Sequence, residues 1–497
     1  MSLGRVIRSS LWLYVSGITS NFLGYVYWLV ATRFVDASTI GSAAAVVGAA
    51  SLIAGAFSLG LSSGATRMLG RSAGRQDREG ISAYFTTSFL MSLSVYGAVS
   101  VLLFLLPWGF MGLTRYELLF VAALILIGSG SWGVILSTLF SSTLRTEVNA
   151  TASILSGMLR LGLGVLLLYM GTGFLGVIWG YIIAAVVSEA VYVYRCRGLV
   201  SIRKPTKGHA KELLLASMPS YIPSILSVAG TWMGVVGIYG LTGGEQAGTY
   251  YIAFMIAALV YSLPLTLLGL MFPVLSGMED GRKRATSRSV KLTYAVIAPI
   301  SALGLAYPWV PLGLLGASYV SSAFVLQILL LGTFVAPITS GFGSLIYAYG
   351  RYKLVTVLGV VSNLPRVILY LPLVAAWGDV GAAVSYVSGY FFALGAVLIL
   401  SPKQGYKIGM KQILSALSIP LVLAFASYLL RLHWVLGTAL VLSVSALAYA
   451  RLGLITREDL REVSAAVLSK RQLSAIYPYT RYILSILYRE QHTDEGA

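Results

Sequence analysis

The sequence predicts an all-α polytopic membrane protein with about fourteen transmembrane helices, arranged as two parallel six-helix repeats followed by two further helices. Three observations predict this fold class. Of the 497 residues, 57% are hydrophobic and only 10% are charged, which is not the composition of a soluble domain. Apolar stretches of about 20 residues, long enough to cross a bilayer core about 30 Å thick, recur along the chain. Basic residues collect in alternate loops, and motifs recur about two hundred residues apart.

The predicted spans follow one another with short connections. The first six cover 11–31, 40–61, 81–106, 118–140, 150–169 and 175–194. The next six cover 213–241, 249–275, 292–309, 322–348, 354–373 and 381–400. The last two, 413–430 and 434–450, are short, and a single re-entrant hairpin is the alternative there. No small-residue cleavage site follows the first span, so we expect that span to be retained.

Membrane topology accounts for the formal net charge of +18. With the N-terminus placed in the cytosol, the loops on that side hold 30 of the 35 Lys and Arg residues. The opposite loops hold only Arg33, Arg115 and Arg431. This asymmetry predicts cytosolic termini, a location in the cell membrane and attraction to anionic lipid, and it argues against nucleic acid as a partner.

An internal repeat relates residues 1–200 to residues 206–405. Ser156 and Arg160 in "ILSGMLRLGLG" fall on Ser362 and Arg366 in "VVSNLPRVILY" at an offset of 206. Three further anchors, at offsets of 205 to 207, pair Arg145 with Arg351, Gly41 with Gly248, and Gly176 with Gly381. Six spans are an even number, so both copies cross the membrane in the same sense. The repeat therefore predicts two bundles around a central cavity.

The repeat sets the expected domain organisation. In chain order we expect an N-terminal six-helix bundle (1–194), a basic cytosolic linker (195–212), a C-terminal six-helix bundle (213–400), two additional helices (401–450) and a cytosolic amphipathic tail (451–497). In the tail, Tyr479, Tyr482, Ile483, Ile486 and Leu487 share one helical face, typical of a helix lying on the inner membrane surface. The lone Cys196 rules out an internal disulfide.

Signatures of catalysis are absent from the sequence. Only three His residues occur, far apart at His209, His433 and His492, so they do not suggest a zinc site or a Ser-His-Asp triad. No phosphate-binding G-x-x-x-x-G-K-[ST] loop is present. We therefore expect no enzyme activity and no cofactor. The chain is expected to move a substrate rather than to make one.

Two arginines near the middle of predicted spans are the strongest candidate site residues. Arg160 lies about 15 Å and Arg366 about 18 Å into its span, and each costs roughly 2.5–3.5 kcal/mol there unless it faces water or a partner. The functional interpretation is a water-filled cationic cavity. The structural interpretation is a buried ion pair, but Glu189 is the only carboxylate within these span limits. A guanidinium matches phosphate oxygens with paired hydrogen bonds, so the cavity interpretation favours an anionic, phosphate-bearing substrate.

The weaker candidates each have two interpretations. Asn21 and Asn363 either line the cavity or hydrogen-bond between helices. Arg33 either joins the cavity or extends to the membrane surface beside Asp36. Glu189 either couples transport to H⁺ or Na⁺ or packs near the basic inner rim.

Prolines mark positions where the predicted helices can bend. The candidates are Pro219, Pro223, Pro264, Pro273 and Pro365. A proline inside a helix removes one backbone hydrogen bond and permits a kink. Bending during alternating access and a static kink are equally compatible with the sequence.

The chain resembles the multidrug/oligosaccharidyl-lipid/polysaccharide exporter superfamily, and within it the polysaccharide transporters, the Wzx-type flippases of lipid-linked oligosaccharides. The stretches "YWLVATRFVDASTIGSAAAVVGAASLIAGAFSLGLSSGATRMLGR", "GGEQAGTYYIAFMIAALVYSLPLTLLGLMFPVLSGMEDG" and "YAYGRYKLVTVLGVVSNLPRVILYLPLVAAWGDVGAAVSY" carry the resemblance, which covers about residues 5–450. It implies a V-shaped pair of bundles that opens alternately to each face. Cationic cavities are common in such families, consistent with Arg160 and Arg366.

The resemblance implies outward translocation of a polyprenyl phosphate- or diphosphate-linked oligosaccharide, for surface polysaccharide or glycoprotein assembly. The expected partners are that substrate, membrane lipids and glycan polymerases or transferases, and we expect a monomer. The first two spans lack the arginines typical of peptidoglycan-precursor flippases, apart from Arg33 at one end, which argues against lipid II. The alternative functions are a cation-coupled drug exporter and, less favoured, a membrane-embedded glycan-assembly enzyme or scaffold.

Overall fold

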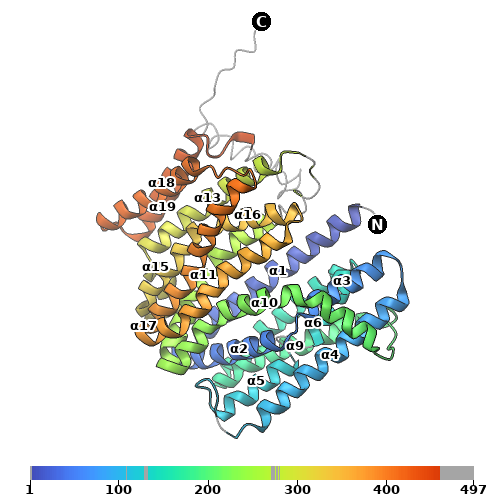
Figure 1. Ribbon diagram of the computed structural model, residues 1–497. Helices are drawn as coiled ribbons and strands as arrows, with labels where there is room; N and C mark the ends of the chain where they lie inside the picture. Colours follow the sequence, from blue (N-terminus) through green and yellow to red (C-terminus); the bar gives the residue numbers. More distant parts are fainter. Residues whose placement is uncertain are drawn as a thin grey trace, which may run out of the picture. The chain divides into compact units, whose positions relative to one another are not determined.

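The computed structural model describes residues 3–107, 109–127, 132–269, 275, 278 and 280–458 (Figure 1). Up to the predicted linker, the helices are α1 (Leu3–Ala31), α2 (Ala37–Phe57), α3 (Leu61–Gly74), α4 (Arg78–Leu105), α5 (Arg115–Ile127), α6 (Trp132–Ser142), α7 (Thr146–Leu159), the π-helical turn η1 (Arg160–Gly164), α8 (Val165–Tyr169) and α9 (Phe174–Cys196). The described residues contain no strand.

The second part of the chain is also helical. It comprises α10 (Lys207–Thr242), α11 (Gly244–Gly269), α13 (Arg282–Ala306), α14 (Trp309–Gly313), the 3₁₀ turn η2 (Ala317–Ser322), α15 (Ala323–Leu331), the 3₁₀ turn η3 (Gly332–Phe334), α16 (Ala336–Ala348), α17 (Tyr352–Lys403), α18 (Met410–Leu429) and α19 (Trp434–Arg451). The predicted amphipathic helix near Tyr479 lies outside the described residues.

Among the described residues, twelve helices are long and apolar enough to cross a membrane. The all-α, multi-pass prediction is therefore confirmed, whereas the count of fourteen stays a prediction. Two helices account for the difference between twelve and fourteen. The helix α1 contributes only the apolar segment Phe22–Ala31 to the search, and α17 counts once although it covers two predicted spans, 354–373 and 381–400.

A glycine divides α17 into those two predicted spans. At about 1.5 Å per residue, its 52 residues would extend about 78 Å, more than twice the bilayer core. Gly378 interrupts it with φ 57° and ψ −130°, a backbone conformation that is essentially restricted to glycine. In the first half of the chain, Gly173 has φ 57° and ψ −129° just before α9. The same backbone turn thus recurs at an offset of 205.

Backbone geometry also repeats at the residues just before α7 and α17. Leu144 and Gly350, 206 residues apart, have φ of 59° and 69°. The next residues, Arg145 and Arg351, begin α7 and α17 and donate their N–H groups five residues back, at 2.8 and 3.0 Å. The segment containing Arg160 and the segment containing Arg366 are therefore equivalent in structure as well as in sequence.

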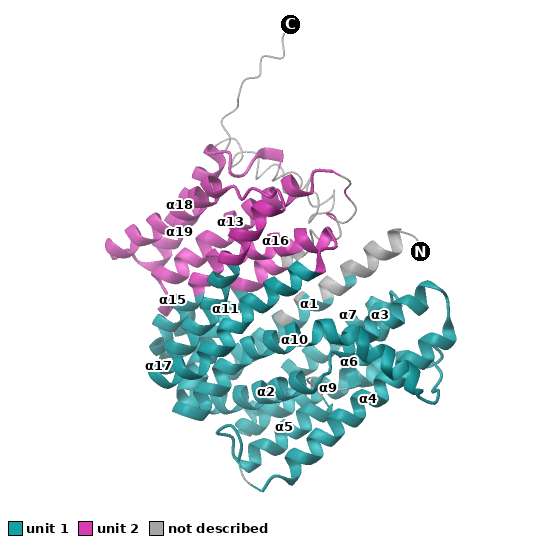
Figure 2. Cartoon of the chain, in the orientation of Figure 1, with its two compact units in different colours: residues 1–259, 311–329, 353–393 teal, residues 260–310, 330–352, 394–497 magenta. Residues whose placement is uncertain are grey.

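The chain divides into two compact units (Figure 2). Unit 1 comprises residues 1–259, 311–329 and 353–393, and unit 2 comprises residues 260–310, 330–352 and 394–497. Within unit 1, α3, α4, α6, α7, α9 and α10 share a core that includes Leu69, Phe140 and Tyr192. Within unit 2, α13, α18 and α19 pack around Ala302 and Val441. The predicted domain boundaries are not tested by this partition and stay a prediction.

Local capping explains where several helices begin. The carboxylate of Asp36 accepts a hydrogen bond from the N–H of Thr39, at 3.2 Å, and so caps α2. At α5, Thr114 and Glu117 form a capping box, in which the carboxylate accepts from the Thr114 N–H at 2.8 Å and the hydroxyl accepts from the Glu117 N–H at 3.3 Å. Polar residues next to apolar runs therefore set these helix starts.

Two glycines let the first turns of α2 and α11 touch within unit 1. A Cβ added at Gly41 would lie 1.9 Å from the carbonyl oxygen of Gly244, and one added at Gly248 would lie 1.8 Å from the carbonyl oxygen of Ala37. The two contacts are reciprocal, because Gly41 is equivalent to Gly248 and Ala37 to Gly244 at the repeat offset of 207. We call this the Gly41–Gly248 contact. No larger residue fits at either position without moving backbone.

Candidate functional site

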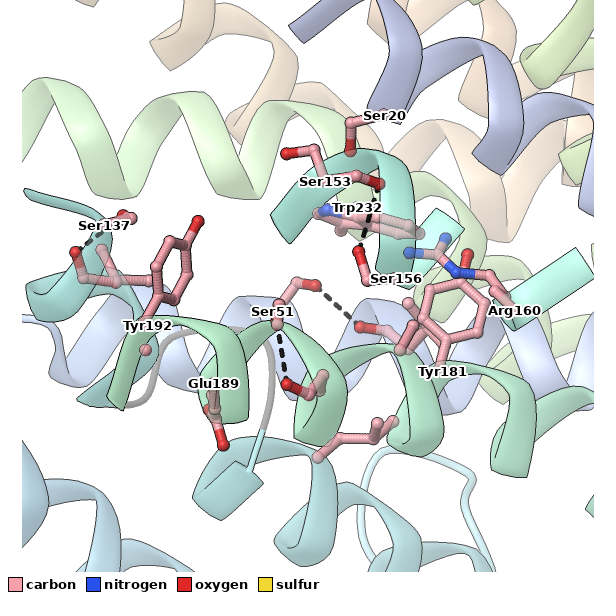
Figure 3. Close-up of a pocket in the computed structure, with 17 residues that line it drawn as sticks. Ser20, Ser51, Ser137, Ser153, Ser156, Arg160, Tyr181, Glu189, Tyr192 and Trp232 are labelled. Carbon is pink, nitrogen blue, oxygen red and sulfur yellow. Dashed lines mark hydrogen bonds between the residues drawn. The ribbon is translucent and has the colours of Figure 1, made fainter. Parts of the chain in front are cut away.

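A cavity of about 400 Å³ lies inside unit 1 (Figure 3). Its lining comes from α1, α2, α5, α6, α7, η1, α9 and α10. The lining residues are Ser20, Val47, Ser51, Leu124, Gly133, Val134, Ser137, Ser153, Ser156, Arg160, Tyr181, Ala184, Ala185, Ser188, Glu189, Tyr192 and Trp232. Trp232 is the one contribution from beyond the predicted linker. The predicted cationic residue Arg160 therefore borders a real cavity.

Arg160 is only partly buried and stands where the helix changes its hydrogen bonding. It opens the π-helical turn η1, a distortion that is frequent at functional sites. Its guanidinium carbon lies 4.6 Å from the ring centroid of Tyr181, a cation–π contact. Its Nε is buried and has no hydrogen-bond partner among the described residues. The group is therefore oriented by an aromatic ring but not neutralised by it.

An aromatic cluster fixes Tyr181. Its hydroxyl accepts a hydrogen bond from Nε1 of Trp28 at 2.6 Å. Trp28 in turn meets Tyr251 edge to face at 4.8 Å, and Tyr251 stacks on Trp232 at 6.1 Å between ring centroids. Trp28 and Tyr251 are almost fully buried. The cluster thus joins the arginine to the indole on the facing helix α10, through side chains that have little freedom to move.

Arg366 occupies the equivalent position but a different environment. Its side chain is only 6% exposed, and its guanidinium carbon lies 4.4 Å from the Tyr386 ring and 4.5 Å from the Tyr390 ring. Nη1 reaches the amide oxygen of Asn363 at 3.5 Å. Arg366 is not among the residues that line the cavity. The structure therefore does not bring the two predicted arginines together in this cavity.

One residue explains why the two arginine sites differ. After Gly173 and Gly378 the repeat offset is 205, so Tyr181 corresponds to Tyr386, and the Arg–Tyr pair is present in both halves. At the same offset Ala185 corresponds to Tyr390. Ala185 lines the cavity beside Arg160, whereas Tyr390 covers Arg366. The first half therefore has a cavity at the position where the second half has the ring of Tyr390.

Glu189 lines the same cavity, away from Arg160. The two groups are held apart along α9, because Tyr181 under Arg160 precedes Glu189 by eight residues, or about 12 Å of helix. Glu189 is only 4% exposed. A Cβ added at Gly133 would lie 2.9 Å from its Oε1, so the carboxylate packs against the start of α6. Figure 3 shows the two groups on opposite sides of the central Ser51.

The remaining polar candidates lie elsewhere. Asn363 donates to the carbonyl of Gly359 in its own helix at 2.9 Å. Arg33 is exposed and donates to the carbonyl of Leu314. Asn21 lies on α1, but its side chain lies outside the described part of the chain. The side chains of Asn363 and Arg33 are not part of the described cavity lining.

The predicted bending prolines are all within helices where they are described. Pro219 and Pro223 lie in α10, Pro264 in α11 and Pro365 in α17. The one non-helical backbone position inside α17 is Gly378, so the helix continues through Pro365. Pro273 lies outside the described residues. Whether any of the five bends during transport stays a prediction.

Sequence reasoning missed several polar features of unit 1. The six serines of the cavity wall come from five helices, and no spacing in the sequence connects them. The sequence limits also excluded Glu117, which is buried and accepts a hydrogen bond from the Tyr239 hydroxyl at 2.6 Å. A predicted fourth span that began at Arg115, where α5 begins, would have included Glu117. Within the described residues no group of three or more His, Cys, Asp and Glu side chains is arranged to hold a metal.

Comparison with solved structures shows which fold this is. The lipid II flippase MurJ in an inward closed conformation aligns with a TM-score of 0.72 and 14% identity, covering 89% of this chain and 99% of that chain. An inward-facing multidrug resistance MATE family transporter of the MOP superfamily aligns with a TM-score of 0.58 and 17% identity, covering 79% and 98%. The predicted superfamily fold is confirmed.

Comparison with sequences narrows the assignment. A Shigella flexneri protein named "Putative O-antigen transporter" is 24% identical over 263 residues, which are 51% of this chain and 63% of that protein. The match thus spans less than two thirds of the relative's length. The model of the polysaccharide biosynthesis protein family matches residues 6–279, more than half of the chain. This chain therefore belongs to the polysaccharide biosynthesis protein family.

Proposed function

We propose that this protein is a flippase that moves a polyprenyl phosphate- or diphosphate-linked oligosaccharide from the cytosolic to the outer face of the cell membrane by alternating access. Arg160, a permanent cation on the wall of a 400 Å³ cavity, is the observation that carries the proposal. Family membership supports a role in polysaccharide assembly. The likeness to a relative named as an O-antigen transporter supports a lipid-linked glycan as the cargo.

Arg160 suits a phosphate in charge and in geometry. Its guanidinium presents a planar fork of hydrogen-bond donors. Because Nε is buried without a partner, an incoming phosphate oxygen supplies a hydrogen-bond acceptor that this atom lacks. Arg366 is proposed to contact phosphate in a conformation in which Tyr386 and Tyr390 uncover it. Transport, rather than synthesis, is proposed because the solved structures that share this fold are a flippase and a transporter.

A cation-coupled drug exporter is the second candidate, and buried Glu189 on the cavity wall is the observation that favours it. A membrane carboxylate binds a proton, a sodium ion or a cationic compound. In a lipid-linked glycan flippase, Glu189 is instead proposed to couple transport to an H⁺ or Na⁺ gradient.

Reconstitution separates the two candidates. Proteoliposomes receive a fluorescent polyprenyl diphosphate-linked oligosaccharide or a cationic dye, and translocation of each is measured. We expect translocation of the lipid-linked glycan, and a fall of about tenfold in Arg160→Ala, because losing a hydrogen bond to a charged group costs about 1.5–3 kcal/mol. Arg160→Lys should restore part of the activity, since it keeps the charge but loses the fork.

Arg115→Ala, at an exposed position outside the cavity, is the control. Dye transport with no glycan transport would favour the drug exporter. Full glycan transport by a folded Arg160→Ala protein would remove Arg160 from the proposal.

A further inference from the structure

The cavity beside Arg160 continues into a second one with an unusual wall. A cavity of about 320 Å³ shares Ser51, Val134 and Trp232 with the first. Each is large enough to hold a small organic group, since ligand pockets run from about 300 to 1,000 Å³. Among the described residues, ten serines line the two cavities: Ser20, Ser51, Ser58, Ser62, Ser92, Ser137, Ser153, Ser156, Ser188 and Ser224. We call these residues the serine wall.

The hydrogen bonds of the serine wall show which ligand groups it can bind. Four of its hydroxyls donate at 2.8–2.9 Å to a carbonyl three or four residues earlier in the same helix. The pairs are Ser51 with Val47, Ser58 with Gly55, Ser137 with Val134, and Ser188 with Ala185. A serine hydroxyl has one donor and two acceptor lone pairs. With the donor already used, each oxygen offers the cavity mainly acceptors.

A surface of acceptors favours a ligand that is rich in donors. Sugar hydroxyls donate hydrogen bonds, whereas an ionised phosphate only accepts them. The carboxyl group of Glu189 adds an acceptor oxygen beside Ser188. Arg160 provides donors only. Arg160 and Glu189 lie toward opposite ends of the cavity (Figure 3), so phosphate is favoured at Arg160 and hydroxyl groups are favoured at Ser51, Ser137 and Ser188.

Trp232 fits the same ligand. It lines both cavities at their junction and stacks on the buried Tyr251, which leaves its ring a fixed apolar plate. A sugar ring has apolar C–H faces between its hydroxyls, and a rigid aromatic side chain packs against such a face with little loss of entropy. A flat plate flanked by acceptors therefore matches a sugar better than it matches a lipid chain or a second phosphate.

We propose that the serine wall and Trp232 form the glycan subsite of the cavity, which holds the sugar next to the phosphate that Arg160 binds. This inference rests on the proposed function and adds to it an orientation of the head group. It also predicts that the protein distinguishes sugars by the positions of their hydroxyls, because fixed acceptors on helices reward matching donors.

Binding of two probes by the purified full-length protein tests the proposal. The first probe is geranyl diphosphate, which has no sugar. The second set is geranyl diphosphate linked to one hexose or one N-acetylhexosamine. In the wild type we expect at least one sugar to increase the affinity about tenfold. In Ser51→Ala/Ser137→Ala/Ser188→Ala that increase should disappear, because each lost hydrogen bond is worth about two- to tenfold, while geranyl diphosphate binds as before.

Two other variants complete the design. Arg160→Ala should weaken both probes and keep the ratio between them. Ser415→Ala, at a half-buried serine that donates to its own helix at 2.9 Å outside the cavities, should change neither. Melting temperatures confirm that each variant is folded, and the single alanine variants replace the triple one if it is not.

The outcomes separate the two proposals. An increase in affinity from the sugar that persists in folded serine variants would overturn the glycan subsite and leave the flippase standing. If no sugar increases the affinity of the wild type, the glycan subsite is likewise overturned and the flippase proposal stands. Failure of the wild type to bind either probe would instead overturn the proposed function.

Discussion

The segment around Arg160 and the segment around Arg366 are built alike, yet only one opens onto a cavity. Both place an arginine about 4.5 Å from a tyrosine ring at equivalent positions, 4.6 Å from Tyr181 and 4.4 Å from Tyr386. The first arginine is partly exposed at the 400 Å³ cavity, and the second is 6% exposed. The comparison teaches that the repeat conserves the Arg–Tyr pair, whereas single neighbouring residues decide whether the cation is available.

The two segments also disturb their helices differently at the same point. In the first half, η1 shifts the helix into π-type hydrogen bonding from Arg160 onward. In the second half, Pro365 directly precedes Arg366 and lacks the N–H that would complete the helix. Each arginine is therefore next to an irregular hydrogen-bonding pattern. The π-helical turn causes it at Arg160, and the proline causes it at Arg366.

The largest expected effect comes from converting the first site into the second. Ala185→Tyr places an aromatic ring where the second half has Tyr390, so it should cover Arg160 and fill the adjacent space. We expect transport of the lipid-linked glycan to fall to the level of protein-free liposomes. Val186→Tyr, at the next residue and 48% exposed, should transport normally. Normal transport by a folded Ala185→Tyr protein would mean that the cavity does not carry the substrate.

A change of intermediate size tests how tightly the second site is packed. A Cβ added at Gly389 would lie 2.1 Å from Nε of Arg366 and 2.1 Å from the carbonyl oxygen of Ser362. Gly389→Ala should therefore lower the stability by about 1–3 kcal/mol, as overpacking does. Gly395→Ala, six residues later in α17 with nothing within 4 Å, is the matched control. Equal melting temperatures for the two variants would show that the second site is loosely packed.

The smallest expected effect comes from removing the hydroxyl of Tyr181 while keeping its aromatic ring. Tyr181→Phe keeps an aromatic face for Arg160 but removes the acceptor for Trp28 Nε1. We expect a loss of stability of about 1–3 kcal/mol, because a buried donor is left unsatisfied, and transport within about twofold of the wild type. Tyr169→Phe, at a site 76% exposed, provides the comparison. A tenfold loss of transport would instead assign the Tyr181 hydroxyl a direct part in binding.

The fold was largely predictable from the sequence, because length and hydropathy of the spans are local properties. The repeat anchors at Arg160 and Arg366 also correctly identified equivalent positions. Their different exposures were not predictable, since they depend on Ala185 in α9 and on Tyr390, which lies beyond the Gly378 interruption of α17. The serine wall could not be predicted from the sequence for a similar reason. Its members are spread over eight helices, and serine in an apolar helix is common and carries no spacing signal.

The Gly41–Gly248 contact makes the two halves meet as two copies of one subunit would. Each glycine faces the carbonyl four residues before the equivalent glycine of the other half, the self-complementary pattern of a two-fold homodimer interface. Such a surface in a separate half-length protein would require association between molecules. In this chain, the segment 197–206 between α9 and α10 joins the halves, so the same surfaces meet at an effective concentration on the order of millimolar. Covalent linkage thus makes the glycine contact independent of the protein concentration.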